Sequence, residues 1–182
     1  MRTPNTKGLQ NKYESLPEEV RAYFEHFPKL AEGFPWDVSI GYLFLLVELA
    51  QNMTLYCGVV KCHRVNSELA RSAIDGHHIT RSAFRDFYKT IFGRPMSKRL
   101  VEKLNEAEKV RDRILHGKIV SEAEKRRAIV KILEYAEEFN AEMHGVAGFK
   151  PFGSLKGFKG RAQPLDKSTS RWILKGIGFE HF

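Results

Sequence analysis

The chain of 182 residues contains only two cysteines, Cys57 and Cys62, too few for a disulfide framework. A reducing compartment is therefore expected. The first 20 residues hold no apolar block, so a secretory signal peptide is not expected. The longest apolar run, residues 40–47, is stopped by Glu48 and is far shorter than the ~18 residues that a membrane span needs. These absences predict a soluble, cytoplasmic protein without a membrane partner.

The alternation of apolar and polar residues that is typical of β-strands is also missing before Gly145. Without strands to precede it, no Gly-rich phosphate loop of the P-loop or dinucleotide type is present, and no internal repeat is evident. The composition, 42% hydrophobic and 29% charged, is ordinary for a globular protein. Together these observations predict an all-α fold.

Apolar residues at helical spacing divide residues 15–145 into a bundle of four to six helices, preceded by a flexible N-terminus over residues 1–14. Ser15 and Glu18 form a capping pattern ahead of the first helix. A long helix from about 38 to 60 is apolar almost all round, which is typical of the central element of a bundle. Further helices are expected over 66–74, 80–92, 97–117 and 121–145. Ser97 and Ser121 are expected to cap the last two, and a glycine closes each of the four segments.

Residues 146–182 are expected to form a basic C-terminal arm. From residue 145 onward the chain has seven basic and two acidic side chains, which supply +5 of the net charge of +8. Frequent glycines disfavour regular helix over most of this segment. Aromatic side chains interleave with the charges: Phe149, Phe152, Phe158, Trp172 and Phe179. The arm is expected either to pack on the bundle or to contact nucleic acid, with the aromatic rings stacked on bases.

The most informative segment is residues 110–117. At about 100° per residue, the apolar residues of the predicted helix fall in one arc, and Arg111 lies near the middle of that arc. The arc contains Leu100, Leu104, Ala107, Ile114 and Leu115. Burying an unpaired guanidinium costs several kcal/mol. Arg111 is therefore expected to have a partner, to reach a wet cleft or to lie at an interface.

Asp112 and His116 are four residues apart, so they are neighbours on one side of this helix. The carboxylate is expected to hold one imidazole nitrogen and leave the other free to exchange protons. An arginine fork that stabilises phosphate oxygens beside such a histidine is suited to phosphodiester cleavage without a metal. An Arg and a His near a helix C-terminus also occur simply as capping partners.

The pattern of Arg111, the polar Asp112 and then His116 after four intervening positions resembles the motif of the HEPN superfamily, and Gly117 is also usual there. The resemblance covers residues 15–145 and implies a small helical bundle. It further implies a metal-independent endoribonuclease with no cofactor, in which Arg111 and His116 are catalytic and Asp112 positions them. Such domains dimerise so that two motifs face each other across a cleft, and a 2′,3′-cyclic phosphate is the expected product.

Dimerisation is also expected from the chemistry, because acid and base roles need two proton carriers and the motif offers one histidine per chain. The family resemblance indicates a role as a toxin, in phage defence or in RNA processing, with a protein inhibitor or antitoxin as a possible further partner. Two alternatives stay open. One is a non-catalytic HEPN module that binds RNA or nucleotide, and the other is a helical protein-interaction subunit.

Other residues are assigned around this motif. A polar strip on the long helix, Glu48, Gln51 and Asn52, either lines the cleft or faces solvent, and Glu48 is a reasonable ion-pair partner for Arg111. The sequences Cys62-His63 and His77-His78 match no standard zinc ligand set, so no metal is expected. Basic side chains near the motif and in the arm are predicted to contact RNA. They are Arg113, Lys118, Arg126, Arg127, Lys156, Lys159 and Arg161.

Overall fold

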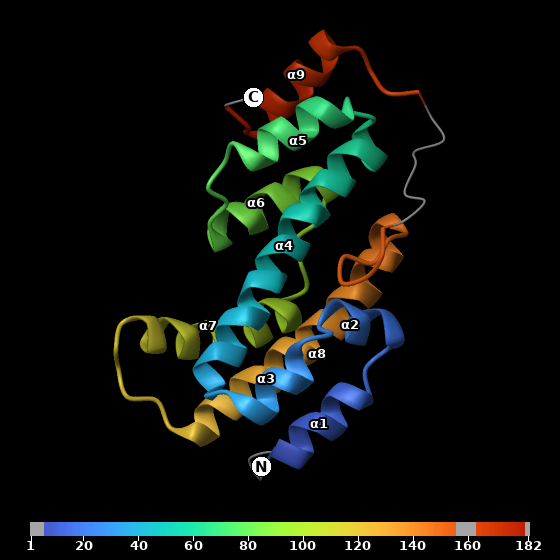
Figure 1. Ribbon diagram of the computed structural model, residues 1–182. Coiled ribbons are helices and arrows are strands. Elements are labelled where there is room, and N and C mark those ends of the chain that lie inside the picture. The colour runs from blue at the N-terminus through green and yellow to red at the C-terminus, as the bar shows by residue number, and fades with distance from the viewer. Residues whose placement is uncertain (1–5, 156–162, 181–182) are drawn as a thin grey trace. The chain divides into compact units, whose positions relative to one another are not determined.

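The computed structural model describes residues 6–155 and 163–180 of the chain. Within these ranges every regular element is an α-helix (Figure 1). The helices are α1 (Thr6–Glu14), α2 (Glu18–Tyr23), α3 (Phe27–Gly33), α4 (Trp36–His63), α5 (Ser67–Asp75), α6 (Arg81–Phe92), α7 (Lys98–Leu115), α8 (Glu122–Ala147) and α9 (Lys167–Ile177). The predicted all-α class is confirmed. The described residues form nine helices, however, where four to six were expected.

The chain divides into two compact units, and α4 and α8 each contribute to both. The first unit comprises the described residues of 1–48 together with 97–142 and 152–154. The second comprises 49–96, 143–151 and the described residues of 155–182. The predicted boundary at Gly145 differs from this division, because Gly145 lies inside α8. One glycine costs a helix only ~1 kcal/mol, which a long, well-packed helix tolerates.

The core of the first unit is rich in aromatic side chains. Phe152 packs against Phe24, Tyr135 and Phe139, with ring centroids 5.6, 6.0 and 6.2 Å away. All four rings are fully buried. α7 adds its own apolar face through Leu100, Leu104 and Ala107, as the sequence predicted. Ion pairs join α7 to α8 through Lys103 and Glu134, 2.7 Å apart, and α8 to the first half of α4 through Lys125 and Asp37, also 2.7 Å apart. The candidate site is built on these three helices.

Residues 6–14 form α1, where the sequence predicted a flexible N-terminus. Leu9 is fully buried, and Lys12 Nζ lies 3.1 Å from Glu137 Oε2 on α8. The predicted capping role of Ser15 is wrong, since its hydroxyl donates to the carbonyl of Lys12 at the end of α1. α1 was missed because it is mostly polar, so a few tertiary contacts hold it rather than a strong apolar stripe.

The second unit begins with the later part of α4, followed by α5 and α6. Asn66 and Thr80 cap α5 and α6 with their side chains, whereas Ser97, the cap expected for α7, makes no side-chain capping hydrogen bond. Gly58 lets α4 and α6 approach closely, because a Cβ at this position would lie 2.6 Å from Ile91 Cγ2. At the end of α6, Gly93 takes a left-handed conformation with φ 68°. Local capping therefore sets the bounds of these helices.

Residues 167–177 form α9, where an extended arm was predicted. The Asp166 carboxylate accepts from the N–H groups of Ser168 and Thr169, which caps the helix. α9 packs on α5 and α6 (Figure 1). The glycines of this segment lie at the end of the helix, at 176 and 178, and therefore do not interrupt it. The aromatic side chains Phe149, Phe152 and Phe179 are buried, so packing accounts for them.

α4 is long and apolar enough to cross a membrane by length and composition alone. The uninterrupted apolar run of residues 40–47, on which the sequence prediction rested, is only one part of this helix. A core helix of a soluble protein meets the same criterion, and 56% of the apolar window in α4 is buried within the protein. By itself, α4 is weak evidence for a membrane span.

Candidate functional site

The candidate site lies where α7 ends and the chain turns toward α8. His116 caps the end of α7, and Gly117 follows it with a φ of 67°. The N–H of Lys118 donates to the carbonyl of Arg113 at 2.8 Å, which closes the last turn in the manner of a Schellman motif. A glycine is needed at 117 because a side chain is strained in this conformation. The local sequence thus sets the backbone that carries His116.

The start of α8 completes this corner through the predicted capping box of Ser121 and Glu124. The Ser121 hydroxyl donates to Glu124 Oε2 at 2.7 Å, and the Glu124 N–H lies 3.3 Å from the Ser121 hydroxyl. Arg113 Nη1 donates to the other carboxylate oxygen of Glu124 at 2.6 Å. The Ser121 hydrogen bond, followed by that of Arg113, lowers the pKa of Glu124 to about 2. The corner is therefore fixed by a charged network between α7 and α8.

Arg111 is held in the first unit by three side chains. Its Nη1 donates to Glu48 Oε1 on α4 at 2.9 Å, and its Nε lies 3.4 Å from Asp112 Oδ1. The guanidinium carbon is 4.5 Å from the centroid of the Phe44 ring, within the range of a cation–π contact. Only 16% of the side chain is exposed. The ion pair with Glu48 that the sequence predicted is therefore present.

This environment restrains the guanidinium without using all of its donors. A guanidinium has five N–H donors in one plane. The contacts with Glu48 and Asp112 take two of them. The Asp112 contact is long and therefore weak. Within the described part of the chain, three donors are left for an acceptor such as a phosphate oxygen.

His116 is exposed at the end of α7, five positions after Arg111. Its N–H donates to the main-chain oxygen of Asp112 at 3.0 Å, so the backbone of the two residues is joined. The Asp112 carboxylate lies beside the guanidinium of Arg111, with Oδ1 3.4 Å from Nε. That this carboxylate orients the imidazole of His116 stays a prediction.

Leu115 does not belong to the core, which corrects the predicted apolar arc. It is 72% exposed, Ile114 is only half-buried, and Ile119 in the following turn is 94% exposed. The last buried residues of α7 are Ala107 and Glu108, Arg111 after them is still largely enclosed, and only the end of the helix at Leu115 extends past the core of the first unit. The buried carboxylate of Glu108 was not expected from the sequence. The exposed leucine and isoleucine thus flank His116.

The polar strip of α4 is divided between the two units. Glu48 belongs to the first unit and contacts Arg111. Gln51 is 8% exposed and Asn52 is half-buried, and both belong to the second unit. Of the three predicted cleft-lining residues, Glu48 contacts Arg111. That Gln51 and Asn52 line a cleft stays a prediction.

The predicted RNA-binding residues have different surroundings. Arg113 is engaged by Glu124 and by the carbonyl of Ile119. Lys118 and Arg127 are exposed, whereas Arg126 is half-buried and its Nε is enclosed without a hydrogen-bond partner. Lys156, Lys159 and Arg161 lie outside the described residues. Lys118 and Arg127 are thus the most exposed of the predicted RNA contacts in the described part of the chain.

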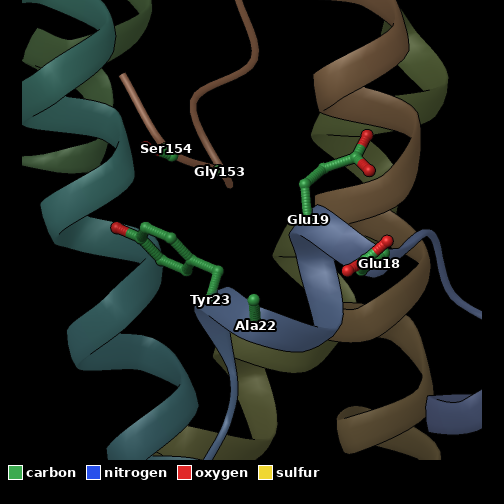
Figure 2. Close-up of a pocket in the computed structure, with 6 residues that line it drawn as sticks. All are labelled: Glu18, Glu19, Ala22, Tyr23, Gly153 and Ser154. Carbon is green, nitrogen blue, oxygen red and sulfur yellow. The ribbon is translucent and has the colours of Figure 1, made fainter. Parts of the chain in front are cut away.

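A pocket that the sequence did not indicate lies between α2 and residues 153–154, with a volume of about 490 Å³. Figure 2 shows the carboxylates of Glu18 and Glu19 on α2 and the ring of Tyr23 around it. Gly153 and Ser154 complete the lining. The Tyr23 hydroxyl donates to the carbonyl of Leu46 at 3.3 Å, and burial raises its pKa to about 12. The phenol therefore stays protonated at neutral pH and serves as a hydrogen-bond donor.

Cysteine and histidine side chains do not gather into a metal site in the described ranges, where no three His, Cys, Asp or Glu residues lie close enough together. His63 contacts the carbonyl of Ile91 at 2.8 Å. His77 Nε2 accepts from the N–H of Glu180, which assigns the proton to Nδ1 and its bond to the carbonyl of Ala73. Burial raises the pKa of the Cys57 thiol to about 12, so this sulfur is not a thiolate nucleophile at neutral pH.

Comparison of the chain with protein-family models, with curated proteins and with solved structures found no match.

Proposed function

We propose that this chain is a metal-independent endoribonuclease of the HEPN type, whose catalytic residues are Arg111 and His116. One observation carries the proposal. A largely buried arginine, held against Phe44 and Glu48, lies on the helix that ends at an exposed histidine. An arginine at this depth is restricted to few rotamers, and such preorganisation favours stabilisation of a charged transition state. The resemblance of residues 111–117 to the HEPN motif indicates the type of reaction, which is cleavage of RNA without a metal.

Each residue has a defined role in this proposal. Arg111 donates hydrogen bonds to the phosphate oxygens that gain charge when the 2′-hydroxyl attacks. The exposed imidazole of His116 removes the proton from that hydroxyl or donates one to the leaving 5′-oxygen. Attack by the 2′-hydroxyl leaves a 2′,3′-cyclic phosphate and a 5′-hydroxyl. Glu48 restrains the position of Arg111 from α4.

A second copy of the chain completes the proposed site. One histidine supplies one of the two proton transfers, so a two-fold partner would supply the other. The exposed apolar side chains around the motif are consistent with such an interface. In the first unit they include Leu115 and Ile119 beside His116, and Leu45 one turn from Glu48 on α4. The proposed dimer would cover these three side chains.

The direct test is cleavage of a labelled RNA by the purified protein in EDTA. Arg111→Ala and His116→Ala are each expected to lower the rate by about 100-fold or more, because each removes a group that acts in the transition state. Lys109→Ala is the matched control, since Lys109 is an exposed cation on the same helix. Its rate should equal that of the wild type. Undiminished cleavage by either site variant would overturn the assignment.

A second candidate is a non-catalytic module that binds RNA or nucleotide. The observation that favours it is the position of Glu48 and Asp112, two carboxylates already beside the guanidinium of Arg111. Their negative charges oppose the charge that develops on the phosphate during cleavage, which lowers the transition-state stabilisation that Arg111 provides. Binding that depends on Arg111 without any cleavage would select this module. If the protein neither cleaves nor binds RNA, a protein-interaction subunit becomes the better description.

A further inference from the structure

Among the described residues, the net positive charge is confined to the second unit. The described residues of this unit include 11 Lys and Arg but only five Asp and Glu. Those of the first unit, which carries Arg111 and His116, have a net charge of −2, whereas those of the second unit have +6. A domain with such an imbalance attracts polyanions by long-range electrostatics. The charge therefore indicates a binding surface separate from the proposed catalytic residues.

α9 presents three cations on one face. Lys167, Arg171 and Lys175 follow each other at four-residue intervals, so they form a row along the helix. All three are exposed. Lys167 Nζ has a partner 3.3 Å away in Glu68 Oε2, although both side chains are well exposed. Phosphate groups along a nucleic-acid backbone match such a row of charges.

Trp172 lies beside this row and is 80% exposed. Its neighbours one turn before and one turn after on the helix are Ser168 and Gly176, which are too small to cover an indole ring. A Cβ built at Gly176 would meet nothing within 4 Å, so no tertiary packing fills this space. An indole with open faces beside cations is the arrangement on which unpaired bases stack.

The opposite face of α9 is firmly anchored, which fixes the position of the exposed face. Ser170 Oγ accepts from the N–H of Asn66 at 2.9 Å, and Leu174 is fully buried. Just after the helix, Phe179 stacks on Phe87 with ring centroids 4.4 Å apart. The helix is thus held on α5 and α6, and the row of cations and Trp172 are presented on a rigid support.

We propose that this exposed face of α9 binds single-stranded RNA, with a base stacked on Trp172 and phosphates on Arg171 and Lys175. Single strands are favoured over duplexes because the bases inside a duplex are already stacked on each other. An anionic membrane is a poorer fit, since the rest of the exposed face is serine, threonine, glycine and cations and offers no apolar area to insert. The proposal is independent of whether Arg111 and His116 cleave RNA.

The test measures the affinity of the full-length protein for a fluorescent 2′-O-methyl oligouridylate of about 12 nucleotides. This probe retains bases and phosphates but cannot undergo attack by a 2′-hydroxyl, so nuclease activity does not affect the result. Trp172→Ala is expected to weaken binding by about tenfold. Trp172→Leu keeps an apolar side chain without a stacking face and should weaken binding equally, whereas Trp172→Phe should retain most of the affinity.

Charge variants test the other half of the proposal. The double variant Arg171→Gln/Lys175→Gln should reduce the slope of log affinity against log salt by about 0.7 for each phosphate that the protein no longer neutralises. Lys89→Gln removes an exposed cation of α6 in the same unit and should change the slope less. Wild-type affinity in Trp172→Ala, or in Trp172→Leu, would overturn the proposal. So would tighter binding to a duplex than to the single strand, or binding only to vesicles of phosphatidylcholine and phosphatidylserine.

Discussion

Asn140 is a buried amide on α8 that fixes the backbone of Phe152. Its Nδ2 donates to the Phe152 carbonyl and its Oδ1 accepts from the Phe152 N–H, both at 2.8 Å. Removing the amide leaves two buried main-chain groups without partners, each at a cost of about 1–3 kcal/mol. Asn140→Ala is therefore expected to lower the free energy of unfolding by about 2–5 kcal/mol, as measured by urea denaturation.

Asn105→Ala is the matched control, because Asn105 is a half-exposed amide on α7. Its substitution should change the free energy of unfolding by less than about 0.5 kcal/mol. If Asn140→Ala were equally mild, the amide would not be what holds residues 152–154 in the first unit.

At the scale of single residues, patterns within one helix could be interpreted from the sequence, and tertiary partners mostly could not. Arg111 stood out because it interrupts an apolar arc, and Glu48 was a reasonable partner because it interrupts an apolar helix. Leu115 was assigned wrongly, since periodicity does not indicate where a helix extends past its core. Asn140 gave no signal, because a polar residue in a helix is ordinary and its partner lies in a loop.

The corner between α7 and α8 predicts a pH dependence at the scale of elements. The pKa of Glu124 is lowered from its ordinary value of 4.5 to about 2 by Ser121 and Arg113. A carboxylate with a lowered pKa in the folded state stabilises the fold above its unfolded pKa, and that contribution is lost as the pH falls toward its folded pKa. Between pH 4.5 and about 2, the wild type should therefore lose more stability than Glu124→Gln.

Urea denaturation at a series of pH values measures this difference. Glu102→Gln provides the control, because Glu102 is an exposed carboxylate on α7 away from the capping box. Its stability should follow the wild-type pH dependence. Parallel curves for Glu124→Gln and the wild type would show that the network does not join α7 to α8 in solution.

Capping residues made several helices predictable, and the three missed elements have physical explanations. Asn66, Thr80 and Ser121 satisfy free N–H groups at helix starts, so they could be recognised locally. α1, α3 and α9 are short and depend on packing for their stability. Pro28 lies in the first turn of α3, where a proline is tolerated, and so does not prevent this helix. Asp166 is in fact a good cap for α9, but the neighbouring glycines obscured it. α9 packs in the second unit and Phe152 in the core of the first, so deleting residues 146–182 would disturb both cores. Point variants are therefore better tests of these residues than truncation.

At the scale of the whole molecule, the division into two units was not predictable from composition. α4 and α8 run through both units without a proline at the boundary. The first unit ends at Glu48 in α4 and at Glu142 in α8, and a single glutamate is ordinary in a helix, so no local feature marks the division. The prediction of a basic arm over residues 146–182 nevertheless indicated part of the difference in net charge between the two units. A net charge of +6 belongs to the described residues of a folded unit that includes α5, α6 and α9. On the proposals above, one unit holds RNA while the other cleaves it.

The proposed dimer gives a prediction about mixed assemblies. Wild-type protein is equilibrated with an excess of the double variant Arg111→Ala/His116→Ala, and RNA cleavage is measured. If both copies contribute to one site, most wild-type chains will pair with inactive partners and the activity per wild-type chain will fall. Mixing with an equal excess of unrelated protein controls for crowding. Activity that depends only on the amount of wild type would indicate that one chain suffices.

The central claim is that Arg111 and His116 act together on the phosphodiester bond of RNA. Mass spectrometry of the RNA fragments produced in the presence of EDTA tests it most directly. The account predicts fragments that end in a 2′,3′-cyclic phosphate and begin with a 5′-hydroxyl, and their absence with either His116→Ala or Arg111→Ala. Intact RNA with the wild type, or fragments that begin with a 5′-phosphate, would contradict it.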